Sequence, residues 1–253
     1  MPVIPAARST LAILRYLASR SGPVRASTLA RDLGLPRSSA YQLIAVMMDE
    51  GFIVHYPEDR TYGLSGLVAE IGTSALRSER LSRLARPLLE SLVARAATPV
   101  VAHLSVLSGA DVIYAARVQG FRAPTTVSTV GVRLPAHLTA TGRAMLARLA
   151  HKQVRALYPS RERLVRRASA GPATLGELDR ILDETRARGW AEEEGDVTEE
   201  YASVAASARD RNGYPTAAIG LTFRRDAGAD AVALGSATVA AADALSARLA
   251  GQR

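Results

Sequence analysis

The chain has 253 residues, 48% of them hydrophobic, which is enough apolar material for one large domain or two modest ones. It contains no cysteine, so disulfides and thiolate metal sites are excluded. The sequence has neither a run of about 18 apolar residues nor a charged start followed by an apolar stretch. We therefore expect no membrane span and no secretory signal, and a location in the cytoplasm.

The formal net charge of +8 is distributed unevenly along the chain. Residues 1–75 carry seven Arg against six acidic residues, whereas residues 76–170 carry a net charge of +12 and residues 171–253 a net charge of −5. The basic excess therefore lies outside the first 75 residues. Net charge alone does not identify a nucleic-acid-binding protein here.

Two short helices are expected at the start of the chain. The apolar period of STLAILRYLASR predicts a helix over residues 9–20, with Ser9 available as its N-cap. STLARDLG predicts a second helix over residues 27–34, with Ser27 as its N-cap and Gly34 as its C-terminal stop.

A third helix is predicted from Pro36 to Gly51, followed by two short strands, FIVHY and TYGL, that form a hairpin around PEDR. The apolar residues of this helix follow a single stripe: Ala40, Leu43, Ile44 and Met47. Three short helices and a hairpin are typical of a winged helix-turn-helix domain, which we assign to residues 1–64.

The opposite face of the third helix is polar but almost uncharged. Arg and Gln side chains can make bidentate contacts to base edges, and Ser and Tyr hydroxyls can donate to phosphate oxygens. A solvated face is the alternative, although solvation alone does not require so uncharged a stripe. The residues expected to contact double-stranded DNA are Ser27, Arg37, Ser38, Ser39, Tyr41 and Gln42.

This segment resembles the N-terminal domain of IclR-family bacterial transcriptional regulators. The likeness runs from the LAIL of the first helix through STLARDLGLPRSSAYQLIAVMMDEGFIVHYPEDRTYGL. The small charge of the domain indicates modest affinity for one copy, and hence binding as a dimer.

The remainder of the chain alternates helical and strand-like segments. Residues 65–80 are expected to form a connecting helix, and the apolar stripe that follows contains Pro87, which predicts either a kink or a new helix. Strands are expected at 100–107, 111–119, 125–130, 201–210 and 216–223, and helices within 131–150, 174–189 and 229–249. This order predicts an α+β domain over residues 81–253.

Two further motifs resemble the effector-binding domain of the same family, whose sheet is related to the GAF fold. They are GVRLPAHLTATGRAMLA at residues 131–147 and RGWAEEE at residues 188–194. The resemblance implies a homo-oligomer, dimer or tetramer, and a small-molecule effector. The chain departs from the family's usual Gly and Cys after the acidic segment, where it has Glu200 and Ser203.

By matching the family's pattern, a cavity is expected to be lined by Ala140, Thr141, Glu193, Ser203, Gly220 and Thr222, with Thr126 and His137 as neighbouring residues. A helix that starts near Thr139 would direct backbone N–H groups into it, which favours a small organic acid, with or without an aromatic ring. Glu193 would repel such an anion unless it is protonated or turned away. The alternative is that these small residues serve close packing of helix and sheet.

The sequence therefore predicts a ligand-responsive DNA-binding regulator, with repression as the expected mode. The alternative is a metabolite-binding protein whose winged domain mediates protein contacts. No enzyme is expected, because the four His are scattered and no HExxH, G-x-S-x-G or phosphate-loop motif occurs. The run EEEGDVTEE is interpreted as a solvated loop and His103 as a half-buried sheet residue, so neither a cofactor nor a metal is expected.

Overall fold

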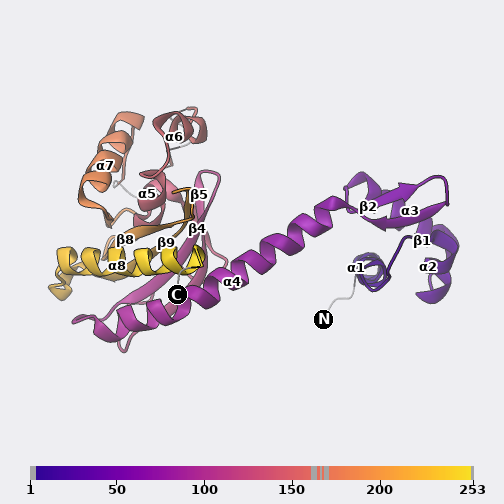
Figure 1. Cartoon of the computed structure of the whole chain (residues 1–253), viewed down its shortest axis with the longest axis horizontal. Helices are drawn as coiled ribbons and strands as arrows, with labels where there is room; N and C mark the ends of the chain where they lie inside the picture. Colours follow the sequence, from indigo (N-terminus) through magenta and orange to yellow (C-terminus); the bar gives the residue numbers. More distant parts are fainter. Residues whose placement is uncertain (1–3, 161–163, 166, 168–170, 252–253) are drawn as a thin grey trace. The chain divides into compact units, whose positions relative to one another are not determined.

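The computed structural model describes residues 4–160, 164–165, 167 and 171–251, and only the backbone of residues 73–78. Contacts divide the chain into two compact units, Met1–Arg77 and Ser78–Arg253 (Figure 1).

The first unit is a three-helix bundle with a small antiparallel sheet. Its elements are α1 (Pro5–Ala18), β1 (Val24–Arg25), α2 (Ala26–Asp32), α3 (Arg37–Asp49), β2 (Ile53–Tyr56) and β3 (Thr61–Leu64). The strands pair in the order β1-β3-β2, so the hairpin expected from the sequence gains a third strand that was missed. The winged helix-turn-helix prediction is confirmed.

The helix starts differ from the sequence prediction. α1 begins at Pro5 rather than Ser9, because proline suits the first helical position. α2 begins at Ala26, with Arg25 at the N-cap and no side-chain cap, so the prediction that Ser27 is the cap is wrong. The stop at Gly34 is as predicted, since this glycine adopts the left-handed conformation (φ +64°) just after α2.

The core of the first unit holds α3 against the other helices and the sheet. Buried side chains come from α1 (Ile13), α2 (Leu29) and α3 (Ile44 and Met47), and Ile53 adds one from β2. Fully burying such a side chain contributes about 1.5–3 kcal/mol. One face of α3 is thereby fixed inward, which presents the opposite face to solvent.

A single long helix, α4, spans Gly66–Arg95. The sequence left open whether Pro87 kinks the helix or starts a new one; the helix continues through Pro87 without a break. The separate helices expected on either side of residue 80 are therefore one element, and it contributes residues to both compact units.

The second unit is built on a six-stranded sheet in which every neighbouring pair is antiparallel. Its strands are β4 (Val101–Ser108), β5 (Asp111–Gln119), β6 (Arg133–Pro135), β7 (Ala191–Glu194), β8 (Tyr201–Arg209) and β9 (Pro215–Arg224). The spatial order is β6-β5-β4-β9-β8-β7, which places the late strand β9 between β4 and β8 and leaves β7 at an edge.

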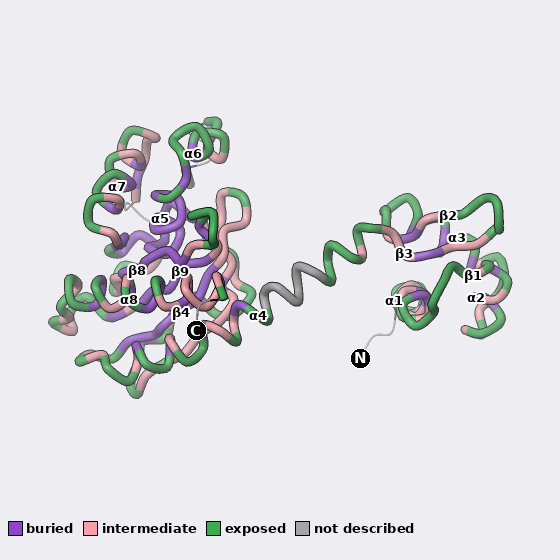
Figure 2. The backbone as a smooth tube through the Cα atoms, viewed as in Figure 1, coloured by how far each residue is buried: buried purple, intermediate pink, exposed green. Residues whose placement is uncertain are grey.

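Helices cover both faces of this sheet. The C-terminal part of α4 and α8 (Ala231–Leu249) pack on one face, and α5 (Ala140–Leu146), α6 (His151–Leu157) and α7 (Leu175–Arg188) pack on the other. Figure 2 shows the buried backbone concentrated between these layers. The α+β prediction is confirmed, and the arrangement is consistent with a GAF-like fold.

Two local predictions in this unit are wrong. The strand expected at 125–130 is irregular loop, in which backbone bonds such as Thr129 N to Val127 O (3.0 Å) replace sheet pairing. The acidic run expected to be a solvated loop begins as strand β7, which pairs with β8. Helix α6 was not predicted as a separate element.

Among the described residues, one helix is long and apolar enough to cross a membrane by length and composition alone, namely α8. Leu234, Ala242 and Leu245 of this helix are buried in the core of the second unit. A core helix of this kind passes the same test as a membrane span, so the result is weak evidence for a span.

Candidate functional site

The exposed face of α3 is polar in its N-terminal half, as the sequence predicted, whereas the exposed side chains near its C-terminal end include Val46 and Met48. Arg37, Ser38, Tyr41 and Gln42 are exposed, with Tyr41 at 53%, while Ser39 is half-buried. This places the four exposed side chains where a partner can reach them. Ser27 is also exposed, in the first turn of α2, although it does not cap that helix.

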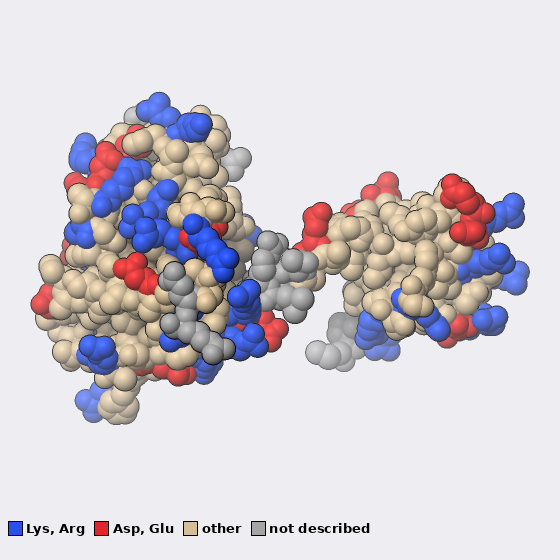
Figure 3. Space-filling view, in the orientation of Figure 1, with Lys and Arg blue, Asp and Glu red and all other residues tan. Residues whose placement is uncertain are grey.

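Basic side chains are not confined to the first unit. In the view of Figure 3, Arg and Lys side chains spread over both units, and many lie on the second unit. This agrees with the net charge of +12 over residues 76–170. The first unit carries little of the net positive charge. Its polar α3 face is therefore a more specific indication of a DNA partner than its charge.

A cavity in the second unit lies between the sheet, the first turn of α5 and the loop before β6. Among the described residues, its lining includes seven of the eight predicted side chains: Thr126, Ala140, Thr141, Glu193, Ser203, Gly220 and Thr222. Its empty volume is about 440 Å³ with the open mouth included, but only about 30 Å³ admits the centre of a water-sized sphere. One water needs roughly 10–15 Å³ on that measure, so a molecule of a few heavy atoms fits without movement of the walls.

Strand register brings three of these side chains together. Glu193 on β7 lies opposite Ser203 on β8, and Ser203 lies opposite Thr222 on β9. Residues paired directly across neighbouring antiparallel strands point to the same face of a sheet. These three polar side chains therefore lie in line across three strands and face the cavity.

Hydrogen bonds join these three side chains to one further strand, β4, and to the loop that contains Thr126 and Ser128. Ser203 Oγ donates to Glu193 Oε1 at 2.7 Å and lies 2.9 Å from Thr222 Oγ1. Nε2 of His103, on β4, lies 3.2 Å from Thr222 Oγ1 and 3.3 Å from Ser128 Oγ. Ser128 Oγ donates to Thr126 Oγ1 at 2.9 Å. We call these six side chains, from Glu193 to Thr126, the polar row.

Burial sets the charge of the two ionisable members of the polar row. Burial, with a smaller contribution from the nearby Arg117, lowers the pKa of His103 to about 3, so the imidazole is neutral at physiological pH. Burial raises the pKa of Glu193 to about 7, against the opposing hydrogen bond from Ser203. Glu193 is therefore partly protonated near neutral pH.

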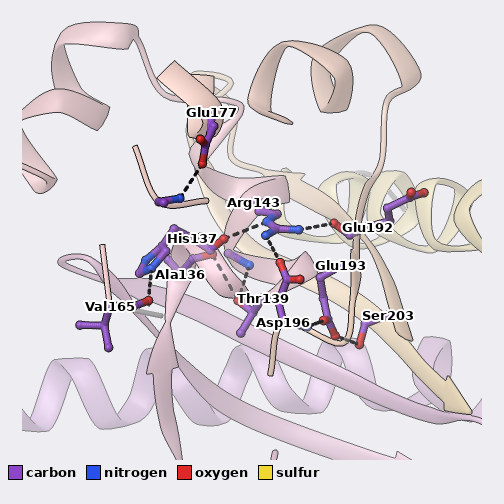
Figure 4. A network of polar contacts seen from close by, with 12 residues as sticks. Ala136, His137, Thr139, Arg143, Val165, Glu177, Glu192, Glu193, Asp196 and Ser203 are labelled. Carbon is purple, nitrogen blue, oxygen red and sulfur yellow. Dashed lines mark hydrogen bonds and ion pairs between the residues drawn. The ribbon is translucent and has the colours of Figure 1, made fainter. Parts of the chain in front are cut away.

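An ion pair behind the cavity wall holds β7 and α5 together (Figure 4). Arg143 on α5 is 4% exposed and pairs with Asp196. The same guanidinium donates to the carbonyl oxygens of His137 and Glu192, each at 2.8 Å. The backbone N–H of Asp196 in turn donates to Glu193 Oε2 at 3.1 Å, so the ion pair indirectly positions Glu193.

His137 is the predicted cavity residue that the structure places elsewhere. Its side chain is fully buried, its Nε2 lies 2.8 Å from the carbonyl oxygen of Val165, and its ring packs edge-on against Tyr158. His137 is therefore absent from the cavity lining, because its side chain packs against Tyr158 and the Val165 backbone instead.

Sequence reasoning missed several lining residues, including His103, Tyr114, Ser128 and Tyr201. His103 was expected to be half-buried, but it is 2% exposed and belongs to the polar row. A polar residue within the apolar run VVAHLSVL was the available signal, since a buried polar side chain needs a partner. Among the described residues, no group of His, Asp and Glu could hold a metal ion.

The electrostatics of the cavity differ from the sequence expectation. α5 has only seven residues, and the N–H of Gly142 in its first turn already bonds to Thr139 Oγ1 at 3.0 Å. Among the described lining residues none is Arg or Lys. The attraction for an anion therefore rests on neutral donors, beside a carboxyl group.

Comparison with known proteins assigns both units. Residues 6–57 match the IclR helix-turn-helix domain, and residues 73–247 match the domain described as bacterial transcriptional regulator IclR C-terminal. The glycerol operon regulatory protein of Streptomyces griseus is 32% identical over 213 residues, covering 83% of this chain and 81% of that protein. The transcriptional repressor IclR of Escherichia coli is 28% identical over 214 residues, covering 84% and 77% of the two chains.

Among solved structures, the Agrobacterium tumefaciens repressor BlcR superposes with a TM-score of 0.60 at 28% identity, over 99% of each chain. The relatives are named as transcriptional regulators and not as enzymes. The polar α3 face and the enclosed polar cavity thus lie in the two domains that the family combines, and the chain belongs to the IclR family of DNA-binding bacterial transcriptional regulators.

Proposed function

We propose that this regulator is a ligand-responsive repressor in the bacterial cytoplasm, which binds operator DNA through α3 and releases it when the cavity is filled. The observation that carries the proposal is the polar row inside a cavity too small and too enclosed to serve another macromolecule. Two relatives, from E. coli and A. tumefaciens, are named repressors, which supports the sign of regulation.

In this proposal the α3 face reads DNA. Arg37 and Gln42 contact base edges, while Ser27, Ser38, Ser39 and Tyr41 hold phosphates.

Replacing Gln42 with Ala is expected to cost about 1–3 kcal/mol in operator binding and to relax discrimination at one base position. The measurement is a titration of operator and scrambled DNA at one salt concentration. Met48→Ala, at an exposed position on the last turn of α3, serves as the control. An unchanged ratio of the two affinities in Gln42→Ala would exclude Gln42 from base readout.

The active form in this proposal is a homodimer through α1 and the start of α4, and two dimers can join as a tetramer. Apolar side chains are exposed on both helices in the first unit: Ile4 beside the start of α1, Leu11, Leu67 and Ile71. Two copies double the phosphate contacts of a domain that carries little net charge. Light scattering that found only monomer, with DNA binding intact, would exclude this form.

The proposed effector is a small organic acid that lies against the polar row, with or without an aromatic ring. Ala140 and Thr141 at the first turn of α5 and the hydroxyls of Ser203 and Thr222 supply its neutral donors and acceptors. A ring would require the walls to move, given the small free volume. A polyol is the second candidate, because the described lining residues include no Arg or Lys and the S. griseus relative is named for a glycerol operon.

Coupling requires that the ligand bind one arrangement of the protein more tightly than another. α4 runs without a break from the winged domain into the core under the sheet, so we propose that it carries the change. Switches of this kind deliver about 1–3 kcal/mol, or roughly 5- to 150-fold in affinity.

Ser203→Leu is expected to fill the cavity and abolish the ligand response, while operator binding without ligand stays within a few-fold of wild type. The measurement is a DNA titration with and without each compound that raises the thermal stability of the wild type. Ser236→Leu, at an exposed position of α8, is the matched control. A full response in Ser203→Leu would place the ligand site elsewhere.

The alternative, a winged domain that mediates protein contacts, is distinguished by a gel shift with the chain's own upstream promoter DNA. Specific retardation supports the regulator. No retardation under any salt condition would favour the alternative.

A further inference from the structure

Among the described residues near Glu193, no positively charged side chain is available to pair with a ligand. The nearest cation is the guanidinium of Arg143, whose donors are occupied by Asp196 and by the carbonyl oxygens of His137 and Glu192. Reassigning it to a ligand would leave Asp196 buried without its partner, which is costly.

The other groups near the carboxyl of Glu193 do not supply a charge either. On the β8 side, Ser203 donates a hydrogen bond to it; from β5, burial holds the pKa of Tyr114 well above its usual range, so its phenol stays neutral. Tyr201 lines the same cavity at the start of β8. The carboxylate of Asp196 disfavours ionisation of Glu193. His103, the member of the polar row that lies on β4, is neutral.

An ionised ligand carboxylate placed beside an ionised Glu193 would therefore lack compensation. Two carboxyl groups at close range in a buried site share one proton, since both cannot ionise together. A hydroxyl group has no such requirement, because it can donate to the carboxylate or accept from the carboxylic acid.

We propose, building on the cavity's role in the proposed function, that the polar row selects ligands that add no uncompensated negative charge: a neutral hydroxyl-bearing molecule, or a carboxylic acid that shares one proton with Glu193. The shared chemistry is a hydrogen bond to the Glu193 carboxyl, made by a ligand hydroxyl or by a ligand carboxyl group. The two sources differ in one respect, since only the acid takes up a proton when it binds near neutral pH.

Because only the acid takes up a proton, measuring ligand affinity at two pH values distinguishes a carboxylic acid from a neutral hydroxyl-bearing ligand. The protonated fraction of a carboxyl group with a pKa of about 7 falls roughly tenfold between pH 6 and pH 8. An acid that needs this proton loses about tenfold in affinity over the same interval. A neutral ligand keeps its affinity within about twofold, because it binds either form of Glu193.

The test is calorimetric titration of the full chain with four three-carbon probes, glycerol, lactamide, lactate and glycerate, at pH 6 and pH 8. We expect glycerol or lactamide to bind equally at both pH values, or lactate or glycerate to bind about tenfold more weakly at pH 8. In Glu193→Gln the pH dependence of acid binding disappears, since the amide donates at every pH. Glu194→Gln, on the same strand but exposed and paired with Arg225, keeps it.

Three outcomes overturn the inference: an acid that binds wild type equally or more tightly at pH 8, a pH dependence that survives in Glu193→Gln, or no binding of any probe. Failure of the proposed function looks different. In that case a probe binds with the expected pH pattern, but operator affinity does not respond to it. Conversely, an operator response blocked by Ser203→Leu, with acid binding independent of pH, would retain the proposed function and exclude the shared proton.

Discussion

Gly142→Ala is expected to destabilise the second unit by about 3 kcal/mol, a large part of the stability of an ordinary domain. A Cβ atom at this position would overlap the backbone of Ala136, in the turn that precedes α5. Neither partner is a flexible side chain, so relief requires movement of α5 relative to that turn. Such movement also displaces Ala140 and Thr141 from the cavity wall.

The effect can be followed in the intact protein, because Trp190 is the one tryptophan in the sequence and is buried in the second unit. Urea unfolding monitored by its fluorescence gives the free energy of unfolding of that unit. Gly176→Ala, where an added Cβ meets nothing within 4 Å in the first turn of α7, is the control and should be neutral or slightly stabilising. A loss below about 1 kcal/mol in Gly142→Ala would contradict the packing described for α5.

Arg143→Met is expected to cost about 3–5 kcal/mol, because it leaves the buried carboxylate of Asp196 without its partner. Removing both charges in Arg143→Met with Asp196→Leu should recover much of this loss, since the penalty comes from the uncompensated charge. The same fluorescence-monitored urea unfolding measures all the variants.

Arg86→Met is the matched control, because Arg86 and Glu90 form an exposed pair on α4 at 3.0 Å, with side chains 70% and 53% exposed. Exposed pairs of this kind contribute about 0–1 kcal/mol. Equal losses in Arg143→Met and Arg86→Met, or a double variant as unstable as Arg143→Met alone, would show that the buried ion pair does not hold α5 to β7.

The winged domain could be predicted from the sequence because its signals are local. The spacing of Ala40, Ile44 and Met47 requires one helical face to be buried, and the structure buries all three. The polar side of α3 then follows from the period of the helix. Strand β1 has only two residues, Val24 and Arg25, and pairs with β3 across more than thirty residues of chain, so no local pattern could reveal it.

The sequence predicted most of the residues that line the cavity, but not the burial and protonation of Glu193. Seven of eight positions came from resemblance to a family, while the burial of Glu193 depends on its register against Ser203. Three consecutive glutamates indicate solvent from the local sequence alone, and it is the alternation of β7, fixed by its pairing with β8, that turns the middle one inward. The loop at 125–130 misled for a related reason, because its Thr and Val residues favour strands wherever packing does not decide.

The alternation of β9 separates two properties of the protein that could otherwise constrain each other. Gly220 and Thr222 line the cavity, whereas the side chains of Ile219, Leu221 and Phe223 belong to the core beneath α4 and α8, and Leu221 also borders the cavity. Replacement of Thr222 can therefore change the cavity wall without changing a side chain of that core, whereas a Cβ atom at Gly220 would lie 2.7 Å from the Thr141 side chain. An insertion or deletion of one residue would exchange the two sets, so we expect relatives to diverge here by replacement and to keep the strand's length.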